Sequence, residues 1–181
     1  LPRRQNRCTG IDAEHPNVSD WKSTAGQLGR RQGAGPRMVD ELSQAKRRLR
    51  QSNLPGIPNF ILSLIEEAEE RTDRANLSIE KQPLDIVQLQ KTLEEARGAV
   101  DHALEQTNKI IEQAELTELV IQYANRYRSR DSILAAKLLE AEELFRKADY
   151  ELALEQAADA VRERDPLALE RIEEFYHKGL A

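Results

Sequence analysis

Long apolar runs, aromatic residues and cysteines are all scarce in this sequence. No window approaches the roughly 20 consecutive apolar residues of a membrane-spanning helix, and the start, Leu1 to Arg4, lacks the apolar stretch of a secretory signal. The only cysteine is Cys8, which excludes an internal disulfide and a cysteine-based zinc site. We therefore expect a soluble chain from a reducing compartment.

The motifs that carry catalysis are also absent. The sequence has no GxxxxGK[ST] phosphate loop, no HExxH metal motif and no nucleophile elbow. Its histidines, His15, His102 and His177, are far apart along the chain. Neighbouring glutamates such as Glu142 and Glu143 point about 100° apart on a helix, so they do not share a site. These absences predict a protein that is not an enzyme and that binds no metal ion and no cofactor.

The composition is typical of a helical chain, except in residues 1–37, which differ from the rest. Leu, Ile, Val and Ala supply most of the apolar side chains, and 33% of the residues are charged. Residues 1–37 hold seven basic and three acidic side chains, whereas residues 38–181 hold 20 and 29. Residues 1–37 are also rich in glycine and lack periodicity, which predicts a disordered leader, either a tag or an out-of-frame segment. Binding of nucleic acid or an anionic membrane is the alternative for this leader.

Two helices and a long heptad pattern follow the leader. Apolar steps of three and four predict a helix over residues 38–52, with Val39 in its stripe, and another over residues 59–81, with Phe60 in its stripe. The prolines between them force a turn. A heptad seam then follows, formed by Leu89, Leu93, Ala96, Val100, Ala103, Thr107, Ile110 and Ala114. We expect this seam to pack on residues 59–81 as an antiparallel coiled-coil hairpin.

The distal part predicts three shorter helices. The first contains Leu134 and Phe145, the second covers residues 150–164, and the third opens at Pro166 and continues through Phe175. The first two resemble one tetratricopeptide-like pair. Because such repeats need about three stacked copies to bury a core, we expect a tight helical hairpin rather than a peptide-binding groove.

The most informative segment is residues 116–130. On a helix, one face, opposite an apolar face, consists of polar side chains of which only one is charged: Gln122, Asn125, Arg126 and Ser129. Amides, a hydroxyl and a guanidinium suit directional hydrogen bonds to a partner. We assign these residues, with Tyr123 and Arg128, to a candidate partner-binding site.

Two other interpretations of this segment stay open. In the first, Gln122 and Asn125 stabilise the fold by bridging to a neighbouring helix. In the second, a basic stripe formed by Arg126, Arg128 and Arg130 binds nucleic acid. However, Arg128 points well away from the other two on a helix, and the surrounding chain is acidic. We therefore expect no nucleic-acid partner.

Three segments resemble the C-terminal portion of the EzrA family of bacterial septation ring formation regulators. They are SNLPGIP (Ser52 to Pro58), AELTELVIQYANRYRSR (Ala114 to Arg130) and EAEELFRKADYELALEQAADAV (Glu140 to Val161). The resemblance covers about residues 38–178, and the QYANRYRS run is its specific part.

The resemblance implies a non-enzymatic regulator of cell division. Its fold would be all-α and elongated, with a spectrin-like antiparallel coiled-coil region at residues 38–130 and a C-terminal helical hairpin subdomain at residues 131–181. Its partners would be FtsZ and other division-apparatus proteins, at the cytoplasmic side of the cell membrane at the septum. The family is anchored by an N-terminal span that we expect this chain to lack, and its Gln-Asn-Arg patch maps onto Gln122, Asn125 and Arg126. The alternative function is a structural spacer or a dimerisation module that self-associates through the seam.

Overall fold

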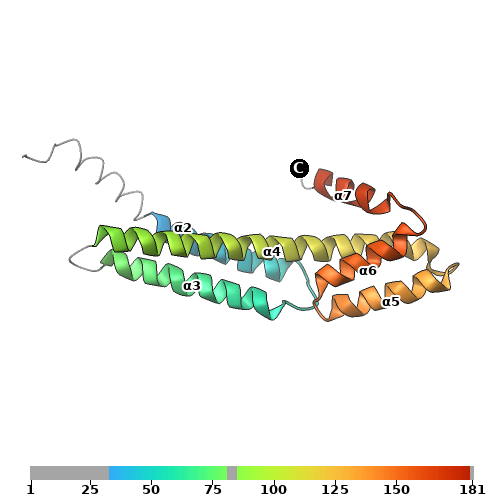
Figure 1. Cartoon of the computed structure of the whole chain (residues 1–181), viewed down its shortest axis with the longest axis horizontal. Helices are drawn as coiled ribbons and strands as arrows, with labels where there is room; N and C mark the ends of the chain where they lie inside the picture. Colours follow the sequence, from blue (N-terminus) through green and yellow to red (C-terminus); the bar gives the residue numbers. More distant parts are fainter. Residues whose placement is uncertain (1–32, 81–84, 180–181) are drawn as a thin grey trace, which may run out of the picture. The chain divides into compact units, whose positions relative to one another are not determined.

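The computed structural model describes residues 33–80 and 85–179, and these residues form an all-α bundle without strands, as predicted. Six helices follow one another in the described part of the chain: α2 Ala34–Gln51, α3 Asn59–Glu80, α4 Ile86–Arg128, α5 Ser132–Arg146, α6 Tyr150–Arg162 and α7 Ala168–Gly179 (Figure 1). Of the predicted leader, residues 1–32 lie outside the described residues. Its last four residues, 34–37, are helical and belong to α2, so the leader is shorter than predicted.

The predicted hairpin is present as α3 and α4. Helix α4 has 43 residues, on the order of 65 Å at 1.5 Å per residue, and Asp85 caps its start by accepting a hydrogen bond from the Gln88 N–H at 3.0 Å. Every one of the eight seam side chains is at most 9% exposed. Helix α3 lies antiparallel beside α4 and buries Ile61, Ile65, Ala68, Thr72 and Ala75. The heptad spacing therefore predicted the buried face of α4 correctly.

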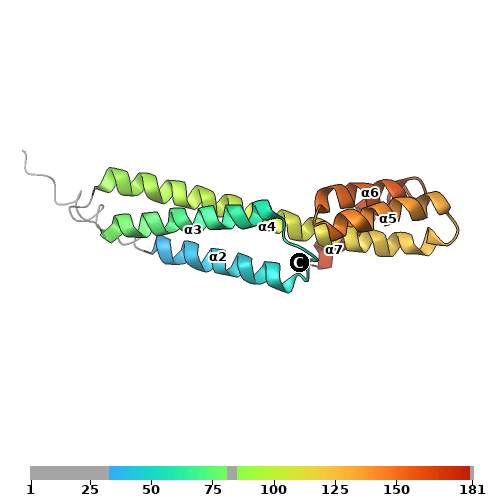
Figure 2. The ribbon, with the colours of Figure 1, turned by 90° about the horizontal axis from the view of Figure 1, so that it is seen from below.

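Helix α2 adds a third layer to this hairpin. It buries four apolar side chains, Met38, Leu42, Ala45 and Leu49, and Figure 2 shows it side by side with α3. Polar contacts at the edges fix its position: the Lys46 ammonium lies 2.6 Å from the Glu69 carboxylate of α3, and the Arg97 guanidinium of α4 lies 2.8 Å from Glu41. Because the side chains of both pairs remain about 35–50% exposed, apolar burial stabilises this packing more than the ion pairs do.

Helices α5 and α6 form a tight hairpin against the second half of α4. The turn between them has Ala148 in the left-handed region, at φ 62°, and the Asp149 N–H donates to the Leu144 carbonyl at 3.1 Å, which closes α5 with a Schellman motif. The first residue of α6, Tyr150, is 1% exposed, and its hydroxyl donates to the Gly56 carbonyl at 2.6 Å. The turn between α2 and α3 is thereby tied to the start of α6.

Helix α7 packs on α4 and α6. Ala168 and Ile172 are buried, and the Tyr176 hydroxyl donates to Glu115 of α4 at 2.5 Å. Together, α4 to α7 enclose the second apolar core of the bundle, formed by Leu116, Val120, Ala124, Leu134, Leu138, Ala141, Ala157, Ala160, Val161, Ala168 and Ile172. This packing positions the C-terminal part of α4 against α7.

Three side chains depart from the apolar stripes that spacing predicts. Val39 is 46% exposed because Met38 takes the buried place at the start of α2. Phe60 is 49% exposed because α3 faces its neighbours through Ile61 instead. Phe175, near the end of α7, is 72% exposed. Periodicity thus located the helices, but it did not decide which apolar residues of each helix face the core.

Candidate partner-binding site

The orientation of the last turns of α4 decides which side chains reach solvent. Leu116, Val120 and Ala124 are buried at steps of four, and a helix that buries these positions turns the intervening ones outward. The outward side chains are those of the predicted polar face, and all four are exposed: Gln122, Asn125, Arg126 and Ser129. Gln122 makes no side-chain hydrogen bond within the described residues, so it does not bridge to a neighbouring helix there.

Part of this face opens into a groove between α4 and α7. The groove has a volume of about 410 Å³ and is lined by Leu119, Gln122, Tyr123, Arg126, Arg171, Ile172 and Phe175. Apolar side chains from both helices form one part of its wall, and an amide and two guanidinium groups form the rest. Such a surface suits a peptide that combines an apolar side chain with hydrogen-bond acceptors.

Tyr123 fixes the geometry of this groove through Asp165, which lies in the turn between α6 and α7. The Tyr123 hydroxyl donates to the Asp165 carboxylate at 2.5 Å, and the Arg171 guanidinium donates to the same oxygen. The hydrogen bond to Asp165 raises the pKa of Tyr123 to about 12. Reciprocally, the Tyr123 hydroxyl, followed by the Arg171 charge, lowers the pKa of Asp165. This cluster holds the start of α7 against α4.

Arg126 is the cation of the groove that has no ion pair within the described residues. Its Nε donates to the Tyr123 carbonyl at 2.9 Å, and its guanidinium carbon lies 3.9 Å from the centre of the Tyr123 ring. Stacking on an aromatic face restrains a guanidinium while leaving its outer N–H groups available. Arg126 is therefore held in place and still able to bind a carboxylate.

The other predicted site residues of α4 and its C-cap do not line this groove. Arg128 donates two hydrogen bonds to Glu142 of α5, at 2.7 and 3.4 Å, and one to Asn125 at 3.3 Å. Ser129 is the C-cap of α4. The structure therefore gathers Gln122, Tyr123 and Arg126 around one groove. Arg128 is paired with α5 instead, and Asn125 contacts Arg128.

Sequence reasoning missed Arg171 and Phe175 as lining residues. Phe175 follows Ile172 at a helical step, so it reads as core. It is exposed because α7 packs through Ala168, Ile172 and Tyr176, at steps of four, which turns Phe175 to one side of the contact. The proximity of Arg171 to Arg126 depends on how α7 folds back over α4, and no local pattern encodes this placement.

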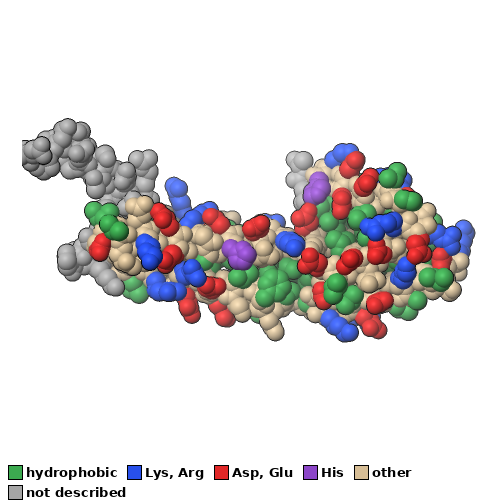
Figure 3. Space-filling view, viewed as in Figure 1, with side chains coloured by type: hydrophobic (Ala, Val, Ile, Leu, Met, Phe, Trp, Pro, Cys, Tyr) green, Lys and Arg blue, Asp and Glu red, His purple; other side chains and the backbone are tan. Residues whose placement is uncertain are grey.

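On the face that Figure 3 shows, basic and acidic side chains are interspersed rather than gathered by sign, a distribution unlike the basic patch that nucleic acid requires.

The fold and the groove define a class: an all-α coiled-coil bundle with a groove of mixed polar and apolar lining between α4 and α7. Among the described helices, none combines the length and apolarity needed to cross a membrane. A family model described as septation ring formation regulator, EzrA, matches residues 32–176. The chain belongs to this family.

Curated relatives agree with the family model. The EzrA proteins of Oceanobacillus iheyensis, Geobacillus kaustophilus and Bacillus subtilis are 50%, 41% and 35% identical to this chain over 126, 141 and 131 residues. These alignments cover 70%, 78% and 72% of the chain. The chain spans only 22–25% of the length of these relatives. No solved structure matches it.

Proposed function

We propose that this chain is a protein-binding part of a regulator of bacterial septation. Family membership supports a role in cell division, because the relatives are named septation ring formation regulators. The observation that carries a binding role is the groove between α4 and α7, where Gln122 and the stacked Arg126 face solvent beside Phe175. The proposed location is the cytoplasmic side of the cell membrane at the septum, with the membrane span supplied by another part of the whole protein.

FtsZ is the partner that we propose for the groove, and the assembly of its ring is the process to be regulated. A segment of FtsZ would place an apolar side chain against Phe175 and Leu119 and a carboxylate against Arg126. The rest of the bundle would set the distance and direction of this contact. The groove itself contributes no chemistry in this mechanism: it binds and orients.

The alternative is a structural spacer that has no ligand site. Dimerisation through the heptad seam is disfavoured in this structure because the seam side chains are already buried within one chain. A dimer through the seam would require α3 and α4 to separate, which would expose that apolar surface to water. A spacer without self-association therefore remains the competing function.

The test compares two double variants of the polar face. Gln122→Ala with Arg126→Ala removes the groove side chains, and Asn125→Ala with Ser129→Ala removes exposed side chains outside the groove lining. All four positions are exposed, and alanine favours helix, so the melting temperature should stay near that of the parent chain. We expect the groove variant to lose binding, because each directional bond contributes on the order of 1 to 3 kcal/mol of affinity.

The measurements are co-sedimentation with polymerised FtsZ, titration of a labelled FtsZ C-terminal peptide, and septal localisation of the full-length protein. The Asn125/Ser129 variant is the matched control and should bind as the parent does. If the parent chain neither binds nor co-sediments with FtsZ, the spacer function is favoured. If the groove variant binds normally, the site assignment is wrong.

A further inference from the structure

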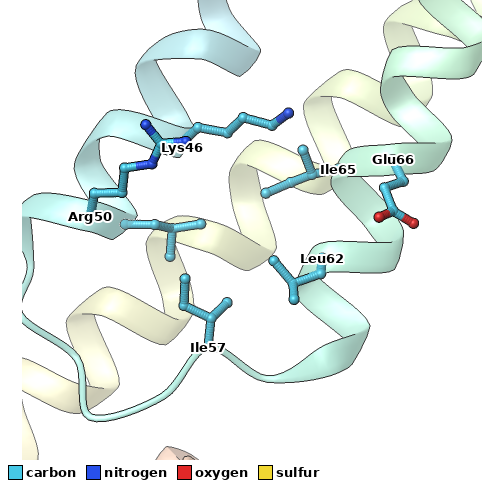
Figure 4. Close-up of a pocket in the computed structure, with 7 residues that line it drawn as sticks. Lys46, Arg50, Ile57, Leu62, Ile65 and Glu66 are labelled. Atoms are coloured by element: carbon cyan, nitrogen blue, oxygen red, sulfur yellow. The ribbon is translucent and has the colours of Figure 1, made fainter.

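A second groove lies far from the candidate site in sequence, between the end of α2 and the start of α3. Figure 4 shows two side chains of α2 on one side and two apolar side chains of α3 with Glu66 on the other. The complete lining is Lys46, Leu49, Arg50, Ile57, Leu62, Ile65 and Glu66. None of these residues takes part in the groove between α4 and α7.

The floor of this groove is apolar and already packed, whereas one wall is not. Leu49 and Ile65 are 4% and 3% exposed and belong to the core, but Leu62 is 44% exposed. The volume of about 210 Å³ is below the roughly 300 to 1,000 Å³ of sites that enclose a whole small molecule. The groove therefore has room for one apolar side chain of a partner rather than for a metabolite.

The α2 side of the groove is positively charged. Lys46 is paired with Glu69, but Arg50 makes no ion pair and no hydrogen bond within the described residues. The start of α3 adds to this potential, because its first turn has no acidic residue and presents the positive end of the helix dipole. An apolar residue bound in the groove would place its neighbours in the peptide within reach of Arg50.

This basic edge belongs to a local cluster on an acidic chain. Four of the five residues from Lys46 to Arg50 are basic, whereas residues 52–181 hold 16 basic and 27 acidic side chains. Glu66, Glu67, Glu69 and Glu70 of α3 lie close to the groove in sequence, so a broad anionic surface such as a bilayer would be repelled there. Of the four, only Glu66 lines the groove, on the side opposite Arg50, so a narrow acidic segment has to keep its carboxylate on the Arg50 side. Residues 1–37 are net basic and so have the wrong charge for the occupant.

We propose that the groove between α2 and α3 is a second protein-docking site. Its partner is an acidic peptide segment with one large apolar side chain, which packs against Leu62 and Ile57 while an adjacent carboxylate pairs with Arg50. Binding at this site is independent of Gln122 and Arg126, so the chain can hold two protein segments at once.

The experiment selects partners by chemistry rather than by name. A phage-displayed library of random peptides is selected against the whole chain, and the selected peptides are synthesised with a fluorescent label. We expect a group of peptides with Leu, Ile or Phe next to Asp or Glu. Their affinity is then measured by fluorescence anisotropy for the parent chain, Arg50→Glu, Leu62→Ser, Arg47→Glu and the Gln122/Arg126 double alanine variant.

Arg47→Glu is the matched control, because Arg47 is also exposed on α2 but does not line the groove. We expect Arg50→Glu and Leu62→Ser each to weaken binding by about tenfold or more, and the other two variants to bind within a few fold of the parent. Equal losses for Arg47→Glu and Arg50→Glu would mean diffuse attraction and would overturn the proposal. A selection in which no peptide depends on Arg50 and Leu62 also overturns it, and leaves the α4–α7 groove unaffected. Thermal melts of Leu62→Ser confirm that the variant is folded.

Discussion

At the scale of single residues, the Tyr123–Asp165 contact makes stability depend on pH at both extremes. Tyr123 has a folded pKa of about 12, above its ordinary value of 10.0. Its contribution to stability is therefore complete below pH 10 and is lost as the pH rises from 10 to 12. The pKa of Asp165 is lowered from 3.8. Its contribution is complete above that value and is lost as the pH falls through the lowered pKa.

Tyr123→Phe should remove the alkaline part of this dependence. Without the hydroxyl there is no proton to lose, so we expect the difference in stability between parent and variant to shrink as the pH rises from 10 to 12. Urea melts at pH 8, 10 and 11.5 measure this difference. Tyr127→Phe is the control: it removes only the second cause of the Tyr123 shift and keeps the hydrogen bond to Asp165, so this variant should still lose stability between pH 10 and 12. A constant difference across these pH values would show that the hydrogen bond does not hold the proton.

The turn at Ala148 stores strain that a single substitution removes. A non-glycine residue in the left-handed region costs roughly 1 to 2 kcal/mol, and Ala148 sits there at φ 62°. Ala148→Gly should therefore stabilise the chain by about 1 kcal/mol, after allowance for the greater freedom of glycine in the unfolded chain. The control is Ala136→Gly in the interior of α5, which should destabilise by about 0.5 to 1 kcal/mol. Chemical denaturation of both variants decides the point, because their free energies of unfolding should change in opposite directions.

At the scale of helices, the seam of α4 is the element that sequence determines most completely. Steps of four and three over eight positions leave a helix one continuous apolar stripe, and burial follows from that stripe whatever the neighbour is. Helix boundaries were equally readable at the prolines between α2 and α3. The shorter helices were harder, because α7 has few apolar residues and the choice between Ile172 and Phe175 depends on distant packing.

A charge in the seam tests this element directly. Val100 is fully buried, so Val100→Asp places an unpaired carboxylate in an apolar contact and should cost about 3 to 5 kcal/mol, a large share of a typical total of about 5 to 15 kcal/mol. Val87→Asp lies in the same helix, but Val87 is 80% exposed, and it should change stability by less than about 0.5 kcal/mol. Circular dichroism melts that show equal stability for the two variants would contradict the packing of α3 on α4.

At the scale of the whole molecule, the polar face of the candidate site could be predicted from the sequence, whereas its contacts with other helices could not. The polar face of residues 122–129 was visible because amides and arginine replace the glutamates and lysines found elsewhere on the surface. Its division into a groove with α7 and an ion pair with α5 was not visible, since both depend on contacts across 14 to more than 40 residues of chain. Tyr123 shows the same limit: its ring belongs to the apolar face of α4, while its hydroxyl reaches Asp165.

Deletion of residues 1–32 should leave the thermal transition of the bundle unchanged, because α2 to α7 bury their apolar side chains among themselves. Deletion of residues 1–42 is the matched control. It removes Met38 and Leu42, which are both 2% exposed, and should lower the melting temperature by several degrees. A large fall for the shorter deletion as well would show that residues 1–32 contribute to the stability of the bundle.

The unbroken length of α4 sets an angular relation between the two grooves. Each residue of a helix advances the direction of its side chain by about 100°, and α4 has no loop or proline between the seam at Leu89 and the groove at Arg126. The number of intervening residues therefore fixes the azimuth of Gln122 and Arg126 relative to the face that packs on α2 and α3. Insertion of one alanine after Ala114 would turn the second half of α4 by about 100° relative to the first. The continuous helix thus fixes the angle between the two grooves, so a partner held at one groove determines the direction in which the other groove points.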